Sequence, residues 1–333
     1  MAVGSGLGSS WGFVSESTYG TYVAPTKFIP VLSATVSRES NRVQGMGLKA
    51  GSDGPLASHY AEATSAGSGT VSFNPPSRGW GQLLQVLAGG TSTCVQQAAT
   101  AAYLQTHTLT GDTLGKSLTI QKGVPYRAGT VRPHTITGAK VTGAEFSCDA
   151  NGGPVSASFT FDAKTWTDAQ TLAAVSYPAD TQPPFHGGQL TVKVGAYASE
   201  ASVAGVRSYS LSISRPHDTE DYTAGASGLK GEPVRNGYTS ITGSLTADWM
   251  DKTVFQDRAH AASTTSLVIE HVGALIASTY YYTLRFTVPG VKFEQSTQNV
   301  DGVGELTNSW NWEWAYDGTN APKIELMSID TTI

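Results

Sequence analysis

The sequence predicts an all-β fold, and three observations carry that prediction. Segments 155–162, 208–214 and 306–314 alternate apolar with small polar or acidic side chains, which is the pattern of strands with one buried face. Charged residues make up only 14% of the chain, and Gly, Ser, Thr and Ala take their place. A helical pattern is confined to 79–87, where a Gly-Gly pair follows as a stop. We therefore expect a β-sandwich with one short flanking helix.

The composition also limits the class of function. Hydrophobic residues make up 39% of the 333 residues, which is enough for a packed core. The formal net charge is −5, from 21 Lys and Arg against 26 Asp and Glu, and there is no basic run. Proteins that grip nucleic acid draw much of their affinity from basic groups on phosphates, so a conventional DNA binder is disfavoured.

Targeting and redox signals are weak. The first ten residues lack the charged and apolar regions of a signal peptide, and no stretch reaches the ~18 apolar residues of a membrane span. Cys94 and Cys148 stand apart from any Cys/His cluster and allow at most one disulfide. We expect a soluble chain with two reduced thiols and no metal or cofactor.

The alternating segments pair into four long hairpins. We predict them over 28–39 with 69–75, 139–149 with 154–163, 206–215 with 238–249, and 283–294 with 305–315. An Asn-Gly pair at 151–152 marks the tight turn of the second hairpin. Loops 40–68 and 216–237 interrupt two of the hairpins, and irregular loops of that length tend to be functional.

The chain also resembles itself. Six segments of the first half have counterparts in the same order in the second half: 33–38 with 210–215, 69–73 with 243–247, the helical segments near Trp80 and Trp249, 117–120 with 266–269, 138–141 with 290–293, and 159–162 with 310–313. We predict an N-terminal arm over 1–27, a first domain over 28–170, a Pro-rich linker over 171–184 and a second domain over 185–333. The alternative is that β chains rich in Ser, Thr and Gly look alike by composition.

No catalytic constellation stands out. The glycine-rich segment 111–117 is one residue too short between its glycines for a phosphate loop, and a strand follows it where the mechanism needs a helix. The acidic loop 217–221 is interpreted as solvated charge rather than a cation site. The carboxylates Asp149, Asp162 and Glu313 point outward in the alternation, which favours surface positions over a glycosidase pair. We do not expect an enzyme.

Trp310, Trp312 and Trp314 share one face of a predicted strand. Such a row can stack on sugars, or it can fill the core of a sandwich. Phe159 and Phe161 hold the corresponding places in the other half, which favours the core.

The opening segment 12–22, followed by Pro25 and a first strand, resembles the start of tail tube proteins of long-tailed (siphovirus) bacteriophages. The Gly-Trp-Gly-Gln-Leu-Leu helix at 79–84 and the terminal strand pair from Phe286 to Trp314 agree with this similarity. It covers essentially the whole chain and implies a duplicated-domain member of that family. The implied fold is two tandem β-sandwich domains whose long hairpins join a β-barrel between subunits.

The same resemblance implies a structural virion protein that is assembled in the host cytoplasm. Its rings stack into the tail tube, the conduit for genome ejection. Most such rings contain six single-domain subunits, so a duplicated chain implies a trimeric, pseudo-hexameric ring, with a hexamer as the alternative. The implied partners are further copies of itself, the tape measure, tail terminator and tail tip proteins, and phage double-stranded DNA in transit without specific binding. No membrane partner is expected.

The polar strand faces are the predicted lining of the channel, because a mildly acidic, hydroxyl-rich wall repels DNA weakly. The residues are Ser33, Thr35, Ser37, Glu39, Glu145, Ser147, Asp149, Ser156, Ser158, Thr160, Asp162, Ser208, Ser210, Ser212, Ser214, Thr246, Asp248, Ser309, Asn311 and Glu313. Contact between rings is predicted for the arm 1–27 and for the two long loops, at Arg42, Met46, Leu48, His59, Tyr60, His217, Tyr222, Leu229 and Arg235.

Two other interpretations stay open on sequence alone. One is a carbohydrate-binding or adhesive β-sandwich protein of the phage tail tip, which would expose the Trp310 face. The other is a capsid decoration or tail terminator protein, which would share much of this composition.

Overall fold

The computed structural model describes residues 5–47, 49–126, 129–179, 182–261, 264–296, 300 and 303–333. Strands make up 52% of the described residues and pair in one antiparallel network, so the predicted all-β fold with a short helix is confirmed. The first half contains β1 (Ser10–Ser15), β2 (Lys27–Phe28), β3 (Ser33–Gln44), β4 (Tyr60–Phe73), α1 (Gly81–Ala88), β5 (Gly89–Gln96), β6 (Tyr103–Leu109), β7 (Leu118–Pro125), β8 (Val131–Asp149), β9 (Ser156–Ala163) and β10 (Thr165–Thr167). The second half contains β11 (Leu190–Ala196), β12 (Ser199–Val203), β13 (Val206–Ser214), β14 (Ser240–Asp248), α2 (Gln256–His260), β15 (Thr265–Ala277), β16 (Tyr280–Phe293), β17 (Thr307–Trp314) and β18 (Lys323–Ser328).

Eight strands contribute to one continuous layer, which we call the long sheet. Their order is β3–β4–β9–β8–β13–β14–β17–β16, with the first four from the first half and the last four from the second. The halves join where the C-terminal part of β8 pairs with β13, which sets Phe146 opposite Leu211. The second half therefore extends the sheet of the first.

A second layer packs behind the long sheet and repeats the same scheme in each half. β1 pairs with β7 and β7 with the N-terminal part of β8, just as β11 pairs with β15 and β15 with the N-terminal part of β16. β18 pairs with both β16 and β6, and so links this layer across the two halves. The β5–β6 hairpin and β18 were not among the predicted strands.

The strand pairing refines the sequence matches between the halves. Thr70 pairs with Thr35, and its sequence counterpart Ser244 pairs with Ser210. By strand pairing, Thr35 of β3 therefore corresponds to Ser210 of β13, whereas the sequence match set Ser33 against Ser210. The two alignments differ by two residues. A shift of two residues keeps every side chain on the same face of the strand, so the pattern of the two halves is preserved.

β8 and β16 each cross from the second layer into the long sheet, and a glycine lies at each crossing. Gly138 and Gly290 have φ of +67° and +75°, a backbone conformation that other residues rarely adopt. A Cβ on Gly290 would lie 2.2 Å from the carbonyl oxygen of Ala315, and one on Gly138 would lie 2.8 Å from Cβ of Lys164. The crossings therefore require glycine both for its conformation and for its small size.

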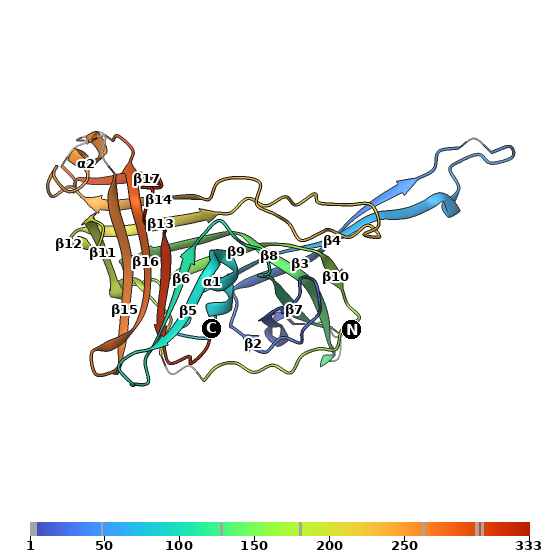
Figure 1. Cartoon of the computed structure of the whole chain (residues 1–333), viewed down its shortest axis with the longest axis horizontal. Coiled ribbons are helices and arrows are strands. Elements are labelled where there is room, and N and C mark those ends of the chain that lie inside the picture. Colours follow the sequence, from blue (N-terminus) through green and yellow to red (C-terminus); the bar gives the residue numbers. More distant parts are fainter. Residues whose placement is uncertain are drawn as a thin grey trace.

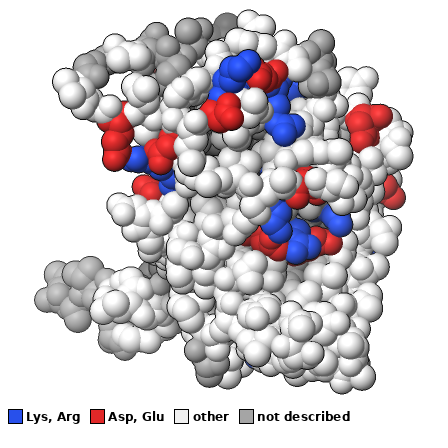
Figure 2. Space-filling view, turned by 90° about the vertical axis from the view of Figure 1, so that its left-hand side faces the viewer, with Lys and Arg blue, Asp and Glu red and all other residues white. Residues whose placement is uncertain are grey.

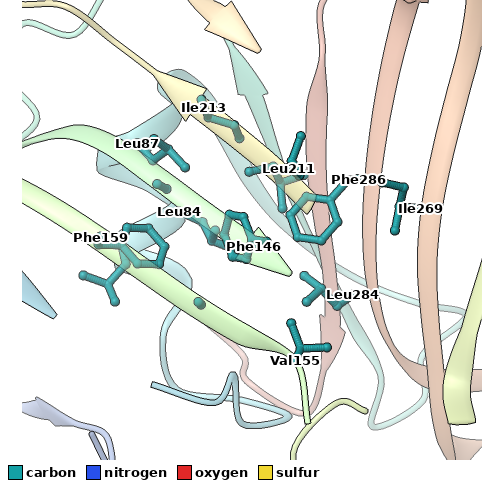
Figure 3. Packing of buried hydrophobic residues seen from close by; sticks show 14 of the residues in the cluster. Leu84, Leu87, Phe146, Val155, Phe159, Leu211, Ile213, Ile269, Leu284 and Phe286 are labelled. Atoms are coloured by element: carbon teal, nitrogen blue, oxygen red, sulfur yellow. The ribbon is translucent and has the colours of Figure 1, made fainter. Parts of the chain in front are cut away.

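One hydrophobic core lies between the layers and runs through both halves. Phe146 and Phe286, from different halves, have ring centroids 4.7 Å apart, and Leu84 of α1 packs into the same cluster (Figure 3). Trp310 and Trp312 are each only 2% exposed, as the core interpretation predicted. Within the described residues, no helix is long and apolar enough to cross a membrane.

Strands β3 and β4 continue beyond the body of the molecule as a projecting hairpin (Figure 1). Their pairing extends to Gln44 opposite Tyr60, so the connection covers only 45–59, whereas a loop over 40–68 was predicted. We call residues 38–66 the arm. Figure 1 shows the arm at one end of the molecule and α2 at the other.

The described part of segment 1–27 is not a free N-terminal arm, contrary to the prediction. Ser10 pairs with Gly123 and Ser15 with Leu118, which makes β1 a strand of the second layer. Trp11 is buried, as are its strand neighbours. The alternation of large apolar side chains in this stretch was the sequence signal for a strand.

Candidate functional site

Small polar side chains from both halves cover one face of the long sheet. Cross-strand register places seven of them in a single row: Ser33, Ser72, Ser158, Glu145, Ser212, Thr242 and Glu313. The adjacent row contains Ser156, Ser147, Ser210, Ser244 and Asn311. Side chains alternate between the two faces of a strand, so these lie opposite the core. We call this surface the polar face.

The structure brings nearly all the predicted channel residues together on the polar face. They are Ser33, Thr35, Ser37 and Glu39 on β3; Glu145, Ser147 and Asp149 on β8; Ser156, Ser158 and Thr160 on β9; Ser208, Ser210, Ser212 and Ser214 on β13; Thr246 and Asp248 on β14; and Ser309, Asn311 and Glu313 on β17. All of them are exposed or half-buried in the single chain.

Hydroxyl groups on the polar face bond to one another across neighbouring strands. The Oγ atoms of Ser33 and Ser72 are 2.7 Å apart in the first half, and those of Ser210 and Ser244 are 2.9 Å apart in the second. Hydroxyls that bond to one another in this way have fewer donors and acceptors free for a ligand.

The charge on the polar face is mainly negative. Glu39, Glu145 and Glu313 are exposed and form no ion pair with any residue that the structure describes. Asp248 differs, because its carboxylate lies 2.5 Å from the guanidinium of Arg207. Lys292, exposed in register beside Glu313, adds a cation to the same face. The face therefore presents mainly carboxylates among hydroxyls.

Asp162 is the exception to the predicted set, because it is buried. Its place in the register puts it on the polar face, but segment 216–237 covers it, and Nζ of Lys230 lies 2.6 Å from Oδ1 of its carboxylate. Beside it, Nζ of Lys140 lies 2.5 Å from Oε1 of Glu232. Burial raises the pKa of Asp162 and lowers that of Lys140, while the opposite charge in each pair counteracts the shift.

Segment 216–237 packs on the first half, so it is not a free loop. The Ser65 N–H donates to the Gly228 carbonyl at 3.0 Å. His217 is buried with Nε2 3.1 Å from Oγ1 of Thr113, and burial lowers the pKa of this histidine to about 4. Three other residues of the predicted ring contact are half-buried in this segment: Tyr222, Leu229 and Arg235. His217 is therefore buried within the single chain, and its predicted ring contact stays a prediction.

The remaining residues predicted for ring contact lie on the arm. Arg42, Met46, His59 and Tyr60 are exposed there, and Met46 is 78% exposed. Leu48 lies outside the described residues. The arm thus presents both apolar and basic side chains away from the body.

The carboxylates that could form a catalytic pair do not converge. Asp149 and Glu313 lie on strands separated by β13 and β14, a distance of about 14 Å across the sheet at ~4.8 Å per strand. That exceeds the ~9.5 Å upper limit for an inverting glycosidase pair. Within the part of the chain that the structure describes, no group of three or more metal-ligating side chains comes together.

The buried histidines and the two thiols have structural surroundings. Nε2 of His271 is 2.9 Å from the Tyr209 hydroxyl, and burial lowers the pKa of His271, and separately that of His107, to about 4. Cys94 and Cys148 are both free, as predicted. None of these groups faces the polar face or the arm as a reactive centre.

A ladder of charges on the second layer was not predicted. Glu270 pairs with Lys193 at 2.6 Å and with Arg285, and Glu325 pairs with Arg285 at 3.3 Å and with Lys323 at 3.0 Å. These residues lie side by side on β11, β15, β16 and β18, so the ladder ties four strands together. Figure 2 shows that the charged side chains at this end of the molecule gather in small groups of both signs.

A long antiparallel sheet with a hydroxyl-rich, mildly acidic face and a projecting hairpin defines a structural β protein. The model of the phage tail tube protein family matches residues 6–313. The chain therefore belongs to the phage tail tube protein family and is a structural protein of the phage tail. No curated protein matched the sequence.

Proposed function

We propose that the chain is a duplicated tail tube subunit, with domains at 28–170 and 185–333, and that three copies form each ring of a siphovirus tail tube. The observation that supports this best is the pairing of β8 with β13, which adds the second half edgewise to the first. The same edge-to-edge pairing between chains would place β3 of one copy beside the β16 end of the long sheet in the next.

Closure of the ring explains why the chain carries open sheet edges. Exposed edges are a liability in a free monomer, but a head-to-tail contact that closes removes them. Eight strands from each of three chains would give a barrel of about 24 strands. Barrels of 16–18 strands already enclose an aqueous channel, so this size leaves room for a conduit.

The polar face would then line the channel through which the genome leaves the capsid. Carboxylates such as Glu145, set among hydroxyls, repel phosphates weakly and offer little that binds DNA. The ends of the tube would contact the tail terminator and tail tip proteins, and the tape measure protein would occupy the channel before ejection. DNA passes without specific binding.

Replacing Glu145 with Lys should leave tubes intact but slow genome passage, because it places a row of cations where DNA must slide. We expect the titre of phage carrying Glu145→Lys to fall about tenfold or more, whereas Glu145→Gln, which only removes charge, stays close to wild type. Electron microscopy of the particles checks that tails have formed. Full infectivity of the Lys variant would refute the assignment of this face to the channel.

Negative-stain electron microscopy of the purified chain at high concentration tests the assembly. We expect hollow rings or tubes with threefold symmetry and six similar lobes per ring. Six chains per ring would contradict the trimer, and a monomer that persists in the presence of the other tail proteins would contradict the tube. Burial of Trp310 and Trp312 disfavours the sugar-binding alternative, since it leaves only the partly exposed Trp314 of that row.

A further inference from the structure

Two ion pairs lie buried side by side on the polar face of the first half. Lys140 and Asp162 are cross-strand neighbours on β8 and β9. Segment 216–237 covers them and supplies the opposite charge to each, with Lys230 on Asp162 at 2.6 Å and Glu232 on Lys140 at 2.5 Å. Lys140, Asp162 and Lys230 are at most 8% exposed. The covering segment comes from the second half of the chain.

The second half has the same pair of cross-strand neighbours, but nothing described covers them. Lys292 pairs in register with Glu313 on β16 and β17, as Lys140 does with Asp162 on β8 and β9. Both Lys292 and Glu313 are exposed. Neither side chain forms a hydrogen bond or ion pair with the residues that the structure describes. The second half therefore presents the same two charges uncompensated.

The arm carries a sequence that matches the covering segment. Gly-Leu-Lys occurs at 228–230 and again at 47–49, in the loop that connects β3 to β4 as 216–237 connects β13 to β14. An acidic residue and then a proline follow in both loops, with Glu232 two residues after its lysine and Asp53 four residues after its own. Lys49 and Asp53 are exposed on the arm. The arm thus offers the same order of charges, Lys before acid.

We propose that the arm of one copy covers Lys292 and Glu313 of a neighbouring copy, with Lys49 pairing with Glu313 and Asp53 pairing with Lys292. The inference rests on the proposed assembly of the chain and specifies a contact within it. The arm must come from a second copy. Lys292 and Glu313 lie on β16 and β17 in the second half, and the chain's own arm projects from the opposite end of the molecule (Figure 1). Each chain would repeat toward its neighbour the covering contact that it makes within itself.

Charge complementarity gives this contact its specificity. A charged side chain that loses water on docking is stabilised by an opposite charge beside it and strongly destabilised by a like charge. Glu–Glu or Lys–Lys juxtaposition at the covered site should therefore block docking. The exchange of both charges should restore it, because the contact needs opposite signs in either order.

The test compares Lys49→Glu, Glu313→Lys and the double variant in subunits that are first shown to be folded. We expect each single variant to raise the concentration needed for tube growth by about tenfold or more, as followed by light scattering and electron microscopy. The double variant should return close to wild type. Both single variants should keep the wild-type melting temperature, because these charges have no partner within the described part of the subunit. Lys230→Glu is the matched control, and it should lower the melting temperature of the isolated subunit.

The outcomes separate this contact from the proposed function. Wild-type tubes together with single variants that assemble normally would overturn the ion pairs and leave the tube intact as a proposal. Impaired single variants that the double variant does not restore would also overturn the pairing of Lys49 with Glu313. Failure of the wild-type chain to form rings or tubes with its tail partners would overturn the proposed function, and this contact with it.

Discussion

Deleting residues 45–59 and joining β3 to β4 by an Asn-Gly turn is expected to give a folded subunit that forms no tubes. The deletion removes only the connection beyond Gln44 and Tyr60, which are the last paired residues of the hairpin. A two-residue Asn-Gly turn suits the twist of such a hairpin, and the core of the body does not involve this segment. Circular dichroism, melting temperature and electron microscopy test the two halves of the expectation.

A second variant separates the reach of the arm from the side chains that it carries. Replacing 45–59 by a Gly/Ser segment of equal length keeps the reach of the arm but removes the side chains of its tip, and it should also fail to form tubes. Normal tubes from either variant would mean that the side chains of 45–59 are not an assembly contact. Tubes from the Gly/Ser variant alone would mean that the backbone reach of the arm matters and its side chains do not.

The polar face could be predicted from sequence because it depends on a local rule. Alternation with a period of two assigns Ser210, Ser212 and Ser214 to one face of a strand whatever the strand pairs with. The same rule placed Trp310 and Trp312 in the core. Residues on one face of several strands then come together once the strands pair, so the surface needed no knowledge of their order.

The fate of Asp162 could not be predicted by that rule, because it depends on a distant segment. Asp162 follows Ser158 and Thr160 at intervals of two residues, so the alternation assigns all three side chains to the same face of β9. What buries Asp162 is Lys230, 68 residues along the chain, on a loop whose path is set by packing on the first half. A lone aspartate in a serine-rich strand was the only sequence signal of a compensating ion pair, and it is a weak one.

The ends of β3 and β4 were missed for a different reason. From Ser37 to Val43 every residue of β3 is exposed, so there is no buried face to generate alternation. Strand detection by hydrophobic pattern stops where the core stops. The arm is held by backbone pairing and by cross-strand contacts such as the ion pair of Arg38 with Glu62 at 2.6 Å, which leave little trace in hydropathy.

The ring that we propose requires the two halves of the chain to differ. The first half is already covered by the second, through β13 on its edge and segment 216–237 on its face. Among the described residues, nothing covers the corresponding edge and the corresponding charges of the second half. If another copy is the next neighbour in the ring, it can cover the second half as the second half covers the first.

Replacing Gly290 with Val is expected to destabilise the subunit strongly. Gly290 holds the crossing of β16 at a φ of +75°, and a Cβ would lie 2.2 Å from the Ala315 carbonyl oxygen. The conformational strain and this backbone clash together should lower the free energy of unfolding by about 3 kcal/mol, or roughly 4 °C in melting temperature for a chain of this length. Chemical and thermal unfolding measure it, with Gly304→Val as the control, because a Cβ on Gly304 has no neighbour within 4 Å. Equal stability of the two variants would contradict the need for glycine at the crossing. Since the crossing delivers Lys292 to the long sheet, a Gly290→Val subunit that still folds should also assemble poorly, and that loss should follow its loss of stability.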